Sequence, residues 1–434
     1  MPRRCLLLLL DGLGDRACPA LGHRTPLEAA HTPHLDRLAA RGACGLLHAA
    51  RPGLALPSEE AHFALFGYGP EEFPGRGALE ALGAGIPLEP GDVAFLAHLD
   101  HAAPDGDGLR LGPERPAASP EEAAALASAL PAVTAEGLRL AFHPTGGLHG
   151  IVRAEGGASP HVTDTDPLAR VEPVLAPRPW ARTPEPGAAA RTARALDAFL
   201  RACHRALRDH PVNRRRRARG LVELNVVVTH RPGRPAEVQP FGERWGLRGL
   251  SIGSGLVYRG MARHLGLEFV PDRDSDDPGA DYLRRIRLAL GADYEFVHVH
   301  TKAPDQAAHT KDPGAKVRAI EALDRAIGEA MEDLTAPGVL LVVTSDHSTP
   351  STGPLIHSGE PVPVLLHGEG VRRDRVDRFD EVSCAGGALG LVRGRDLLPM
   401  VLDLLDRAKL RGLRDAPVDQ PYWPGDREPW RVRE

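Results

Sequence analysis

Short apolar runs flanked by polar residues recur along this chain. They cover Cys5–Leu10, Glu295–His300, Val339–Thr344 and Val362–Leu366. Runs of this length that are apolar throughout are typical of buried parallel strands in an α/β sheet. Polar residues of the kinds that carry chemistry follow each run at once. The pattern therefore predicts four buried parallel strands with functional residues at their ends.

Apolar residues recur at helical spacing between these runs. The segment Pro33–Arg41 follows the first predicted strand, and Ala315–Met331 precedes the third. The second helix shows the clearer stripe, formed by Val317, Ile320, Leu323, Ala326 and Ile327. Because strand and helix alternate, we predict an α/β fold with a mainly parallel sheet flanked by helices.

The middle of the chain has a different character. Residues 102–115 are rich in Gly, Pro and Asp, an Ala-rich helix is predicted near Pro120–Leu130, and His143–Pro186 reads as a loop-rich zone. This change predicts a smaller α/β domain inserted over residues 89–271. The core domain would then be discontinuous and comprise residues 1–88 and 272–434, which suits a chain of 434 residues.

Composition and charge narrow the class of protein. Hydrophobic residues make up 42% of the chain, charged residues 26%, and the formal net charge is -5. A nucleic-acid binder usually carries excess positive charge, so we expect no nucleic-acid partner and interpret the basic cluster Arg214–Arg217 as a solvated helix end. The first apolar run ends at Asp11, and no stretch approaches the roughly 20 apolar residues of a membrane span.

The five cysteines are far apart and form no Cys-x-x-Cys motif. Such a pattern favours reduced thiols in the cytoplasm. We therefore expect a cytoplasmic protein that does not associate with membranes, and the sequence does not decide between a monomer and a homo-oligomer.

Carboxylates and imidazoles collect after the predicted strands. Asp11 follows the first strand, Asp305 and His309 follow the second, Asp346 and His347 follow the third, and His357 precedes the fourth. Each alone has a structural explanation such as a cap, a turn or surface charge. At one sheet edge, however, three carboxylates and three histidines would be costly to bury without cations.

This mixed ligand set suits zinc or manganese, because magnesium and calcium prefer oxygen ligands. Six side chains exceed the needs of one ion. The sequence thus predicts two divalent metal ions, manganese or zinc, with magnesium or cobalt as alternatives. Asp305 and His309 are four residues apart and would share one helical face.

Ser58 is the candidate nucleophile. It precedes a short helical pattern, where it could also be a simple N-cap. A serine at a helix N-terminus faces the positive end of the helix dipole and could meet both a phosphate and a metal. Lys302 and Arg76 would add positive charge for phosphate oxygens, although either could form an ordinary surface ion pair.

These residues resemble the alkaline phosphatase superfamily and, within it, the archaeal-type cofactor-independent phosphoglycerate mutases. The resemblance rests on Asp11–Arg16, Thr32–Asp36, Ser58–Pro70, Gly75–Gly85, Lys302–His309, Ser345–Pro350 and His357–Pro363. It implies an alkaline-phosphatase-like core with an inserted domain that closes over the substrate. It also implies a phosphoserine intermediate at Ser58.

Carried over position by position, the resemblance implies two metal sites. The first is formed by Asp11, Ser58, Asp346 and His347, and the second by Asp305, His309 and His357. Lys302, Arg76 and Arg115 would contact a small phosphorylated carboxylic acid.

The inserted domain departs from the family's pattern. Leu111–Arg115 stands where the family tends to carry an arginine-rich turn, Leu148–Gly150 where it usually has His-Arg, and His230 with Arg231 where it has an arginine. Histidine does not replace the bidentate contacts of arginine. The resemblance predicts interconversion of 2- and 3-phosphoglycerate. The departures in the inserted domain add the prediction of mutase-like transfer on a related phosphorylated or phosphonylated acid. A metal-dependent phosphatase or phosphodiesterase and a non-catalytic metal-binding regulator are the alternatives.

Overall fold

The computed structural model describes residues 2–432, which form two compact units. The first unit contains the chain up to Phe73 and from Val238 on, and the second spans Pro74–Glu237. Both boundaries fall earlier in the sequence than we predicted. The later boundary was misplaced because composition does not reveal that two strands after residue 238 join the sheet of the first unit.

The first unit is built on an eight-stranded sheet with the order β11-β10-β12-β1-β13-β14-β2-β15. Its strands are β1 (Arg4–Leu10), β2 (Ala43–His48), β10 (Gly249–Gly253), β11 (Glu268–Pro271), β12 (Phe296–Thr301), β13 (Val339–Thr344), β14 (Val362–His367) and β15 (Gly390–Arg393). The strands from β11 to β13 run parallel, whereas β14 is antiparallel to both β13 and β2. The prediction of a parallel strand at β14 was wrong. The apolar side chains of a strand that is buried on both faces do not indicate whether it runs parallel or antiparallel to its neighbours.

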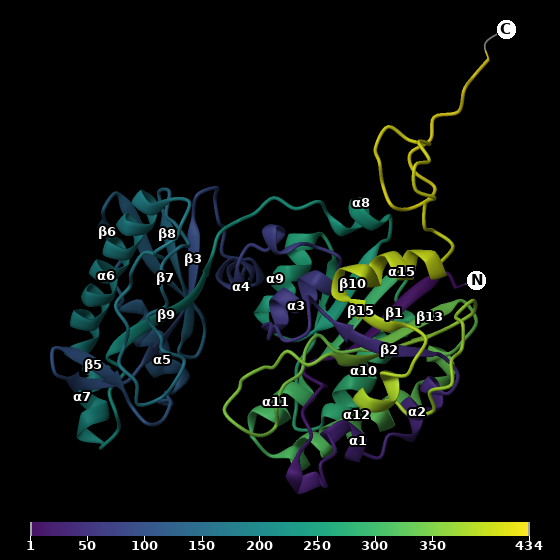
Figure 1. Cartoon of the computed structure of the whole chain (residues 1–434). Coiled ribbons are helices and arrows are strands. Elements are labelled where there is room, and N and C mark those ends of the chain that lie inside the picture. Colours follow the sequence, from purple (N-terminus) through teal and green to yellow (C-terminus); the bar gives the residue numbers. More distant parts are fainter. Residues whose placement is uncertain (1, 433–434) are drawn as a thin grey trace. The chain divides into compact units, whose positions relative to one another are not determined.

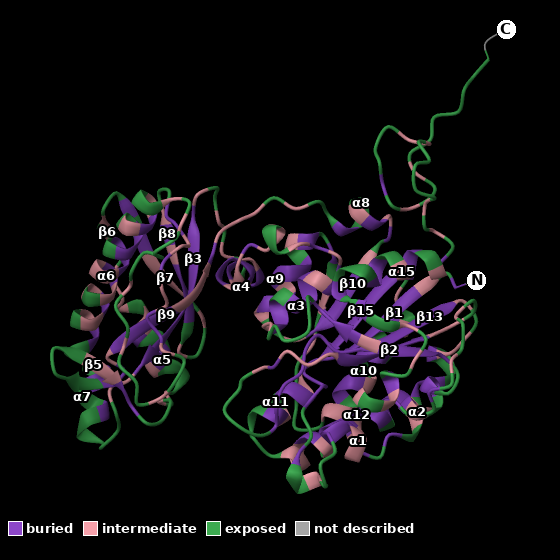
Figure 2. Cartoon of the chain, in the orientation of Figure 1, coloured by how far each residue is buried: buried purple, intermediate pink, exposed green. Residues whose placement is uncertain are grey.

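Helices cover both faces of this sheet (Figure 1). They include α1 (Pro26–Ala29), α2 (Pro33–Ala39), α3 (Ser58–Leu65), α8 (Phe241–Trp245), α9 (Leu256–Leu265), α10 (Pro278–Gly291), α11 (Ala303–His309), α12 (Pro313–Glu329), α13 (Met331–Leu334), α14 (Glu381–Cys384) and α15 (Leu397–Leu404). Alternate residues of β1, such as Leu6 and Leu8, pack with Ile286 of α10 and Leu323 of α12 in one apolar core. Figure 2 shows the central strands of this sheet almost continuously buried, as their apolar runs predict.

The second unit holds an antiparallel sheet with the order β6-β7-β8-β3-β9. Its elements are α4 (Arg76–Ala84), β3 (Val93–Asp100), β4 (Ala102–Asp105), β5 (Gly108–Leu111), α5 (Pro120–Ser128), β6 (Val133–Ala135), β7 (Leu138–Gly146), β8 (His149–Glu155), α6 (Pro186–Arg208), α7 (Pro211–Ala218) and β9 (Val226–Gly233). Leu196 and Phe199 of α6 pack against Phe95 and Val152 on one face of the sheet. The predicted loop zone His143–Pro186 was therefore wrong in its first part, where β7 and β8 form a hairpin.

Among residues 2–432, no helix is both long enough and apolar enough to cross a bilayer. The five cysteines are buried free thiols.

Candidate metal centre

The candidate metal ligands gather where three neighbouring parallel strands end. β1 lies between β12 and β13, with Leu10 opposite Thr301 and Leu9 opposite Thr344. Asp11 and Asp346 therefore emerge side by side, and α11 begins beside them after β12. The carboxyl ends of parallel strands form the usual ligand crevice of an open α/β sheet.

Tight backbone turns aim the carboxylates inward. Gly12 has a φ of 66°, and a Cβ atom at this position would lie 2.7 Å from the Asp305 side chain. The N–H groups of Gly12 and His347 donate to Asp346 Oδ1 over 3.1 and 3.0 Å. The chain thus leaves the β13 pleat directly after the strand, as the sequence Ser348–Pro350 predicts.

The first group of ligands surrounds Ser58. Ligand atoms of Asp11, Asp346 and His347 lie within 4.8 Å of one another. Ser58 Oγ is 2.9 Å from His347 Nε2 and donates to Asp11 Oδ1 over 3.4 Å. Pro57 is the N-cap residue of α3 and Ser58 is its first residue, so Ser58 does not serve as the cap.

The second group is centred on Asp305. Asp305 Oδ1 lies 3.3 Å from His309 Nε2 and 3.5 Å from His357 Nε2. Asp305 and His309 share one face of α11 at the predicted spacing of four residues. Ligand atoms of Asp305, His347 and His357 lie within 4.8 Å of one another, and the rings of His347 and His357 stack at 3.8 Å. His347 therefore lies between the two groups.

The charges of the cluster compensate one another. Burial raises the pKa of Asp11, but Lys302 and the contacts with His300 and His347 outweigh this effect and hold it below the usual range. Burial likewise opposes ionisation of Asp305, whose pKa is nevertheless lowered by His309, His357 and Lys302.

The pKa of His347 is itself lowered by burial, so the imidazole favours its neutral, metal-binding form.

These residues fit a bound cation. Asp346 Oδ2 is buried and has no hydrogen-bond partner, although this same oxygen lies 3.3 Å from His347 Nε2. An orphaned carboxylate oxygen is costly unless a cation or a donor satisfies it. A cavity of about 10 Å³ borders Asp346 and His347, but its other lining residues, such as Leu47 and Val362, lie outside the ligand groups. A larger cavity of about 690 Å³ adjoins this one, shares Leu54 and Leu56 with it, and lies between apolar residues such as Phe63.

Four further residues belong to the cluster that sequence reasoning did not assign. Tyr258 donates to Asp11 Oδ2 over 2.8 Å, and His300 Nε2 lies 3.0 Å from the same oxygen. His62 Nδ1 lies 2.7 Å from the Ser58 carbonyl oxygen and 3.4 Å from Asp346 Oδ2. Thr349 donates to Asp305 Oδ1 over 2.8 Å. His62 could have been found from its position four residues after Ser58, on the same helical face.

The three predicted cationic residues are divided between the units. Lys302 Nζ lies 3.8 Å from Asp11 and 3.7 Å from Asp305 in the first unit. Arg76 is the first residue of α4 in the second unit, where its guanidinium pairs with Glu80 over 2.8 Å. Arg115 is an exposed residue of the second unit.

The sheet and its cluster of carboxylates and imidazoles define a metal-dependent α/β enzyme. The family model of the metalloenzyme superfamily matches residues 3–404. The chain therefore belongs to this superfamily. The alkaline-phosphatase-like α/β fold predicted from the sequence is confirmed.

Within the superfamily the chain belongs to the archaeal-type 2,3-bisphosphoglycerate-independent phosphoglycerate mutases, as the sequence motifs indicated. It is 39% identical to 2,3-bisphosphoglycerate-independent phosphoglycerate mutase 2 of Methanocaldococcus jannaschii, with 98% of each chain covered. The corresponding mutase of Methanopyrus kandleri is 37% identical, with 95% of this chain and 99% of the relative covered. Members of this family are isomerases, and the chain is an enzyme of this class.

Solved structures agree with this assignment. A protein from Pyrococcus horikoshii is 30% identical with a TM-score of 0.77, and the match covers 95% of this chain and 100% of that one. The cofactor-independent phosphoglycerate mutase of Thermoplasma acidophilum is 27% identical with a TM-score of 0.62, covering 93% and 100%.

Proposed function

We propose that this enzyme interconverts 2- and 3-phosphoglycerate in the cytoplasm through a phosphoserine at Ser58. The names of its relatives support the substrate. The observation that carries the intermediate is the position of Ser58 Oγ, at the start of α3 and within reach of both Asp11 and His347. A helix N-terminus favours the negative charge of a phosphoryl group.

The reaction consists of two transfers in opposite directions. Ser58 Oγ bonds to phosphorus as the ester oxygen of the substrate leaves, and the proton lost from Ser58 ends on that oxygen as a hydroxyl. The glycerate then presents its other hydroxyl, which takes the phosphoryl group and returns a proton to Ser58. No water is consumed, so exclusion of water separates this mutase from a phosphatase.

The two ligand groups would hold the divalent ions. Asp11, Ser58, Asp346 and His347 would bind one ion, and Asp305, His309 and His357 the other. Manganese or zinc suits these mixed ligands, and the bound ions would stabilise negative charge on the phosphoryl oxygens. We further propose that the second unit is the substrate domain, in which Arg76 and Arg115 assist Lys302 in binding the anionic substrate.

A phosphorus NMR experiment tests this proposal. Manganese-loaded protein is incubated with 3-phosphoglycerate, and the same sample is quenched in acid for mass spectrometry of the peptide that contains Ser58. We expect 2-phosphoglycerate to form and the peptide to carry a phosphoryl group. Ser58→Ala should lose both signals, with activity reduced by more than about a thousandfold.

Ser254→Ala is the matched control, because this serine pairs with Asp274 at the surface of the first unit. It should retain isomerisation. Release of inorganic phosphate would indicate a hydrolase instead. Binding of two metal ions without turnover would contradict 3-phosphoglycerate as the substrate, and isomerisation that survives Ser58→Ala would contradict the intermediate.

A further inference from the structure

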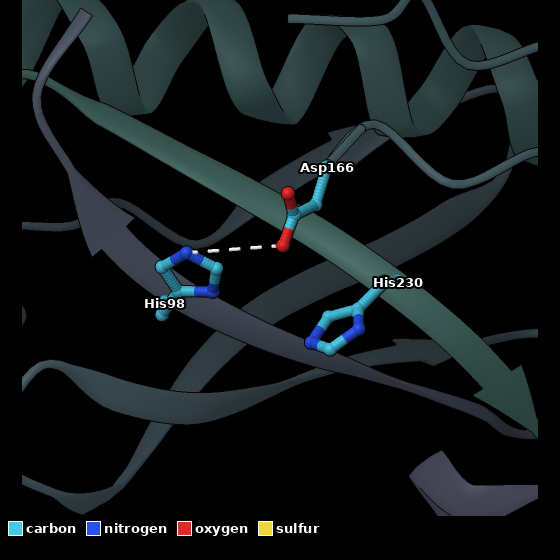
Figure 3. A group of neighbouring side chains, drawn as sticks. All are labelled: His98, Asp166 and His230. Atoms are coloured by element: carbon cyan, nitrogen blue, oxygen red, sulfur yellow. Dashed lines mark ion pairs between the residues drawn. The ribbon is translucent and has the colours of Figure 1, made fainter. Parts of the chain in front are cut away.

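A second group of ligand-type side chains lies on the sheet of the second unit. It consists of His98 from β3, His230 from β9 and Asp166 from the segment before α6 (Figure 3). One potential ligand atom of each residue lies within 4.8 Å of those of the other two. His98 and Asp166 are buried, and His230 is half-buried. This group shares no residue with the cluster around Ser58.

The strand register places both histidines on one face of the sheet. β3 and β9 are antiparallel, with Leu96 opposite His230 and His98 opposite Val228. The opposite face carries Phe95 and the apolar core beneath α6. The histidines are therefore not needed to fill that core, and their ring planes meet edge to face rather than stack.

Asp166 is held in place by its own backbone surroundings. The Thr165 N–H donates to the Thr229 carbonyl oxygen, and the Thr229 N–H donates to Thr165 Oγ1, both over 2.8 Å. These two hydrogen bonds hold Asp166 beside Thr229, the residue that precedes His230. Asp166 Oδ1 accepts the Leu168 N–H over 2.8 Å, which leaves Oδ2 directed toward His98.

The distances suit ligands of a common ion better than direct partners. Asp166 Oδ2 lies 3.9 Å from His98 Nε2, too far for a hydrogen bond. Bonds of about 2.0–2.2 Å to one metal ion would separate two ligand atoms by roughly 3–4 Å. His230 Nδ1 is shielded from solvent and has no hydrogen-bond partner. Simple packing of the two rings leaves this nitrogen unexplained.

Asp100 lies beside the same ring nitrogen of His98 as Asp166. Its Oδ2 lies 3.3 Å from His98 Nε2, and Arg170 donates to its two oxygens over 2.6 and 3.1 Å. The Asp100 carboxylate is thus already paired with Arg170, and a metal ion bound at His98 Nε2 would replace its contact with that nitrogen. The positive charges of Arg115 and Arg231 near His230 disfavour a bare cation but favour an anion beside a bound one.

We propose that His98, Asp166 and His230 bind a divalent transition-metal ion, separate from the ions at Ser58. Two imidazoles and one carboxylate suit zinc, cobalt or iron rather than magnesium or calcium. Three protein ligands leave coordination positions open for water or an anionic oxygen ligand.

Metal content measured on the full chain tests this inference. The protein is loaded with Co²⁺, freed of excess ion by gel filtration, and analysed by inductively coupled plasma mass spectrometry. We expect His230→Ala and Asp166→Asn each to bind one cobalt equivalent fewer than the unaltered chain. His143→Ala is the matched control, because this half-buried histidine lies in β7 of the same sheet and outside the group. It should retain the full content.

A second measurement separates this site from the cluster around Ser58. In a chain carrying Asp305→Asn and Asp346→Asn, the cobalt that remains should show a visible absorption spectrum that disappears with His230→Ala. Circular dichroism of the metal-free variants checks that they are folded. Equal cobalt content in the unaltered chain and in folded His230→Ala would overturn the proposal, whatever the outcome at Ser58.

Discussion

At the scale of single residues, the hydroxyl group of Tyr258 orients the Asp11 carboxylate. This residue is buried in α9, and its hydroxyl shares Asp11 Oδ2 with His300. The other oxygen of Asp11 faces Ser58 and His347. Tyr258 thus leaves Asp11 Oδ1 as the oxygen that faces the proposed metal site, as outer hydrogen-bond partners of a metal ligand commonly do.

Tyr258→Phe should therefore weaken metal binding by about 10- to 100-fold, because Asp11 loses a donor that orients it. A chelator competition titration with manganese measures the change. Tyr294→Phe is the control, since Tyr294 is half-buried and lies beside Arg248, away from the cluster. Equal affinities in the two variants would show that Tyr258 does not position Asp11.

Glu381 has a different role, in the pH dependence of stability. Its carboxyl accepts hydrogen bonds from Thr25 Oγ1 over 2.7 Å and from the Asp15 N–H over 3.1 Å. Burial raises the pKa of Glu381 from 4.5 to about 7. The folded state therefore binds more protons than the unfolded state between these pH values, so this group lowers the stability as pH rises through that window.

Glu381→Gln should remove this dependence, because the amide resembles the protonated acid. Across the same window the unaltered chain should lose up to about 3 kcal/mol more stability than the variant. Urea unfolding of the metal-free protein at pH 5 and pH 8 measures the difference. Parallel pH profiles for both proteins would mean that Glu381 is ionised in the folded state throughout.

At the scale of elements, α12 holds together the two loops that carry the proposed metal ligands Asp11, Asp346 and His347. Its fully buried Lys316 donates to the carbonyl oxygens of Gly14 and Thr349, each over 2.8 Å, and pairs with Asp15 over 3.1 Å. The loops after β1 and β13 are thereby held at a fixed separation. A buried ammonium group is tolerated here because three acceptors surround it.

Lys316→Met should cost about 3–5 kcal/mol of unfolding free energy, since it leaves Asp15 as an uncompensated buried charge. Lys311→Met should cost about 1 kcal/mol, because Lys311 is exposed and its bonds to Pro350 and Leu355 can be replaced by water. Urea denaturation compares the two. Similar losses of unfolding free energy in the two variants would contradict a special role for the buried ammonium group of Lys316.

The elements themselves were predicted unevenly. The apolar runs located β1, β12, β13 and β14 to within about one residue, since a strand buried on both faces is marked by its own side chains. β8 was missed because it begins with His-Gly after a glycine turn and pairs with β7, in which buried and exposed residues are mixed. Strand direction and pairing depend on distant partners and leave no local signal.

On the scale of the whole molecule, each unit has its own apolar core. Leu8 lies in the core of the first unit and Phe199 in that of the second, and both are fully buried. Units with separate cores often unfold as separate steps.

Calorimetry of the metal-free chain should therefore show two transitions. Leu8→Ala, costing about 2–5 kcal/mol, should lower the temperature of one, and Phe199→Ala, costing about 3–5 kcal/mol, should lower the other. Each variant serves as the control for the other. A single transition lowered by both substitutions would show that the units unfold together.

The sequence by itself determined the α/β class and the central strands, and it placed the candidate ligands directly after them. These features depend on the local hydrophobicity of each run and on the polar residues that follow it in the chain. Tertiary structure alone decided that His347 lies between both ligand groups, that Tyr258 holds Asp11, and that His98 meets Asp166. Each of these contacts joins segments far apart in the chain, and their approach is set by the packing of whole strands and helices rather than by any neighbouring residue.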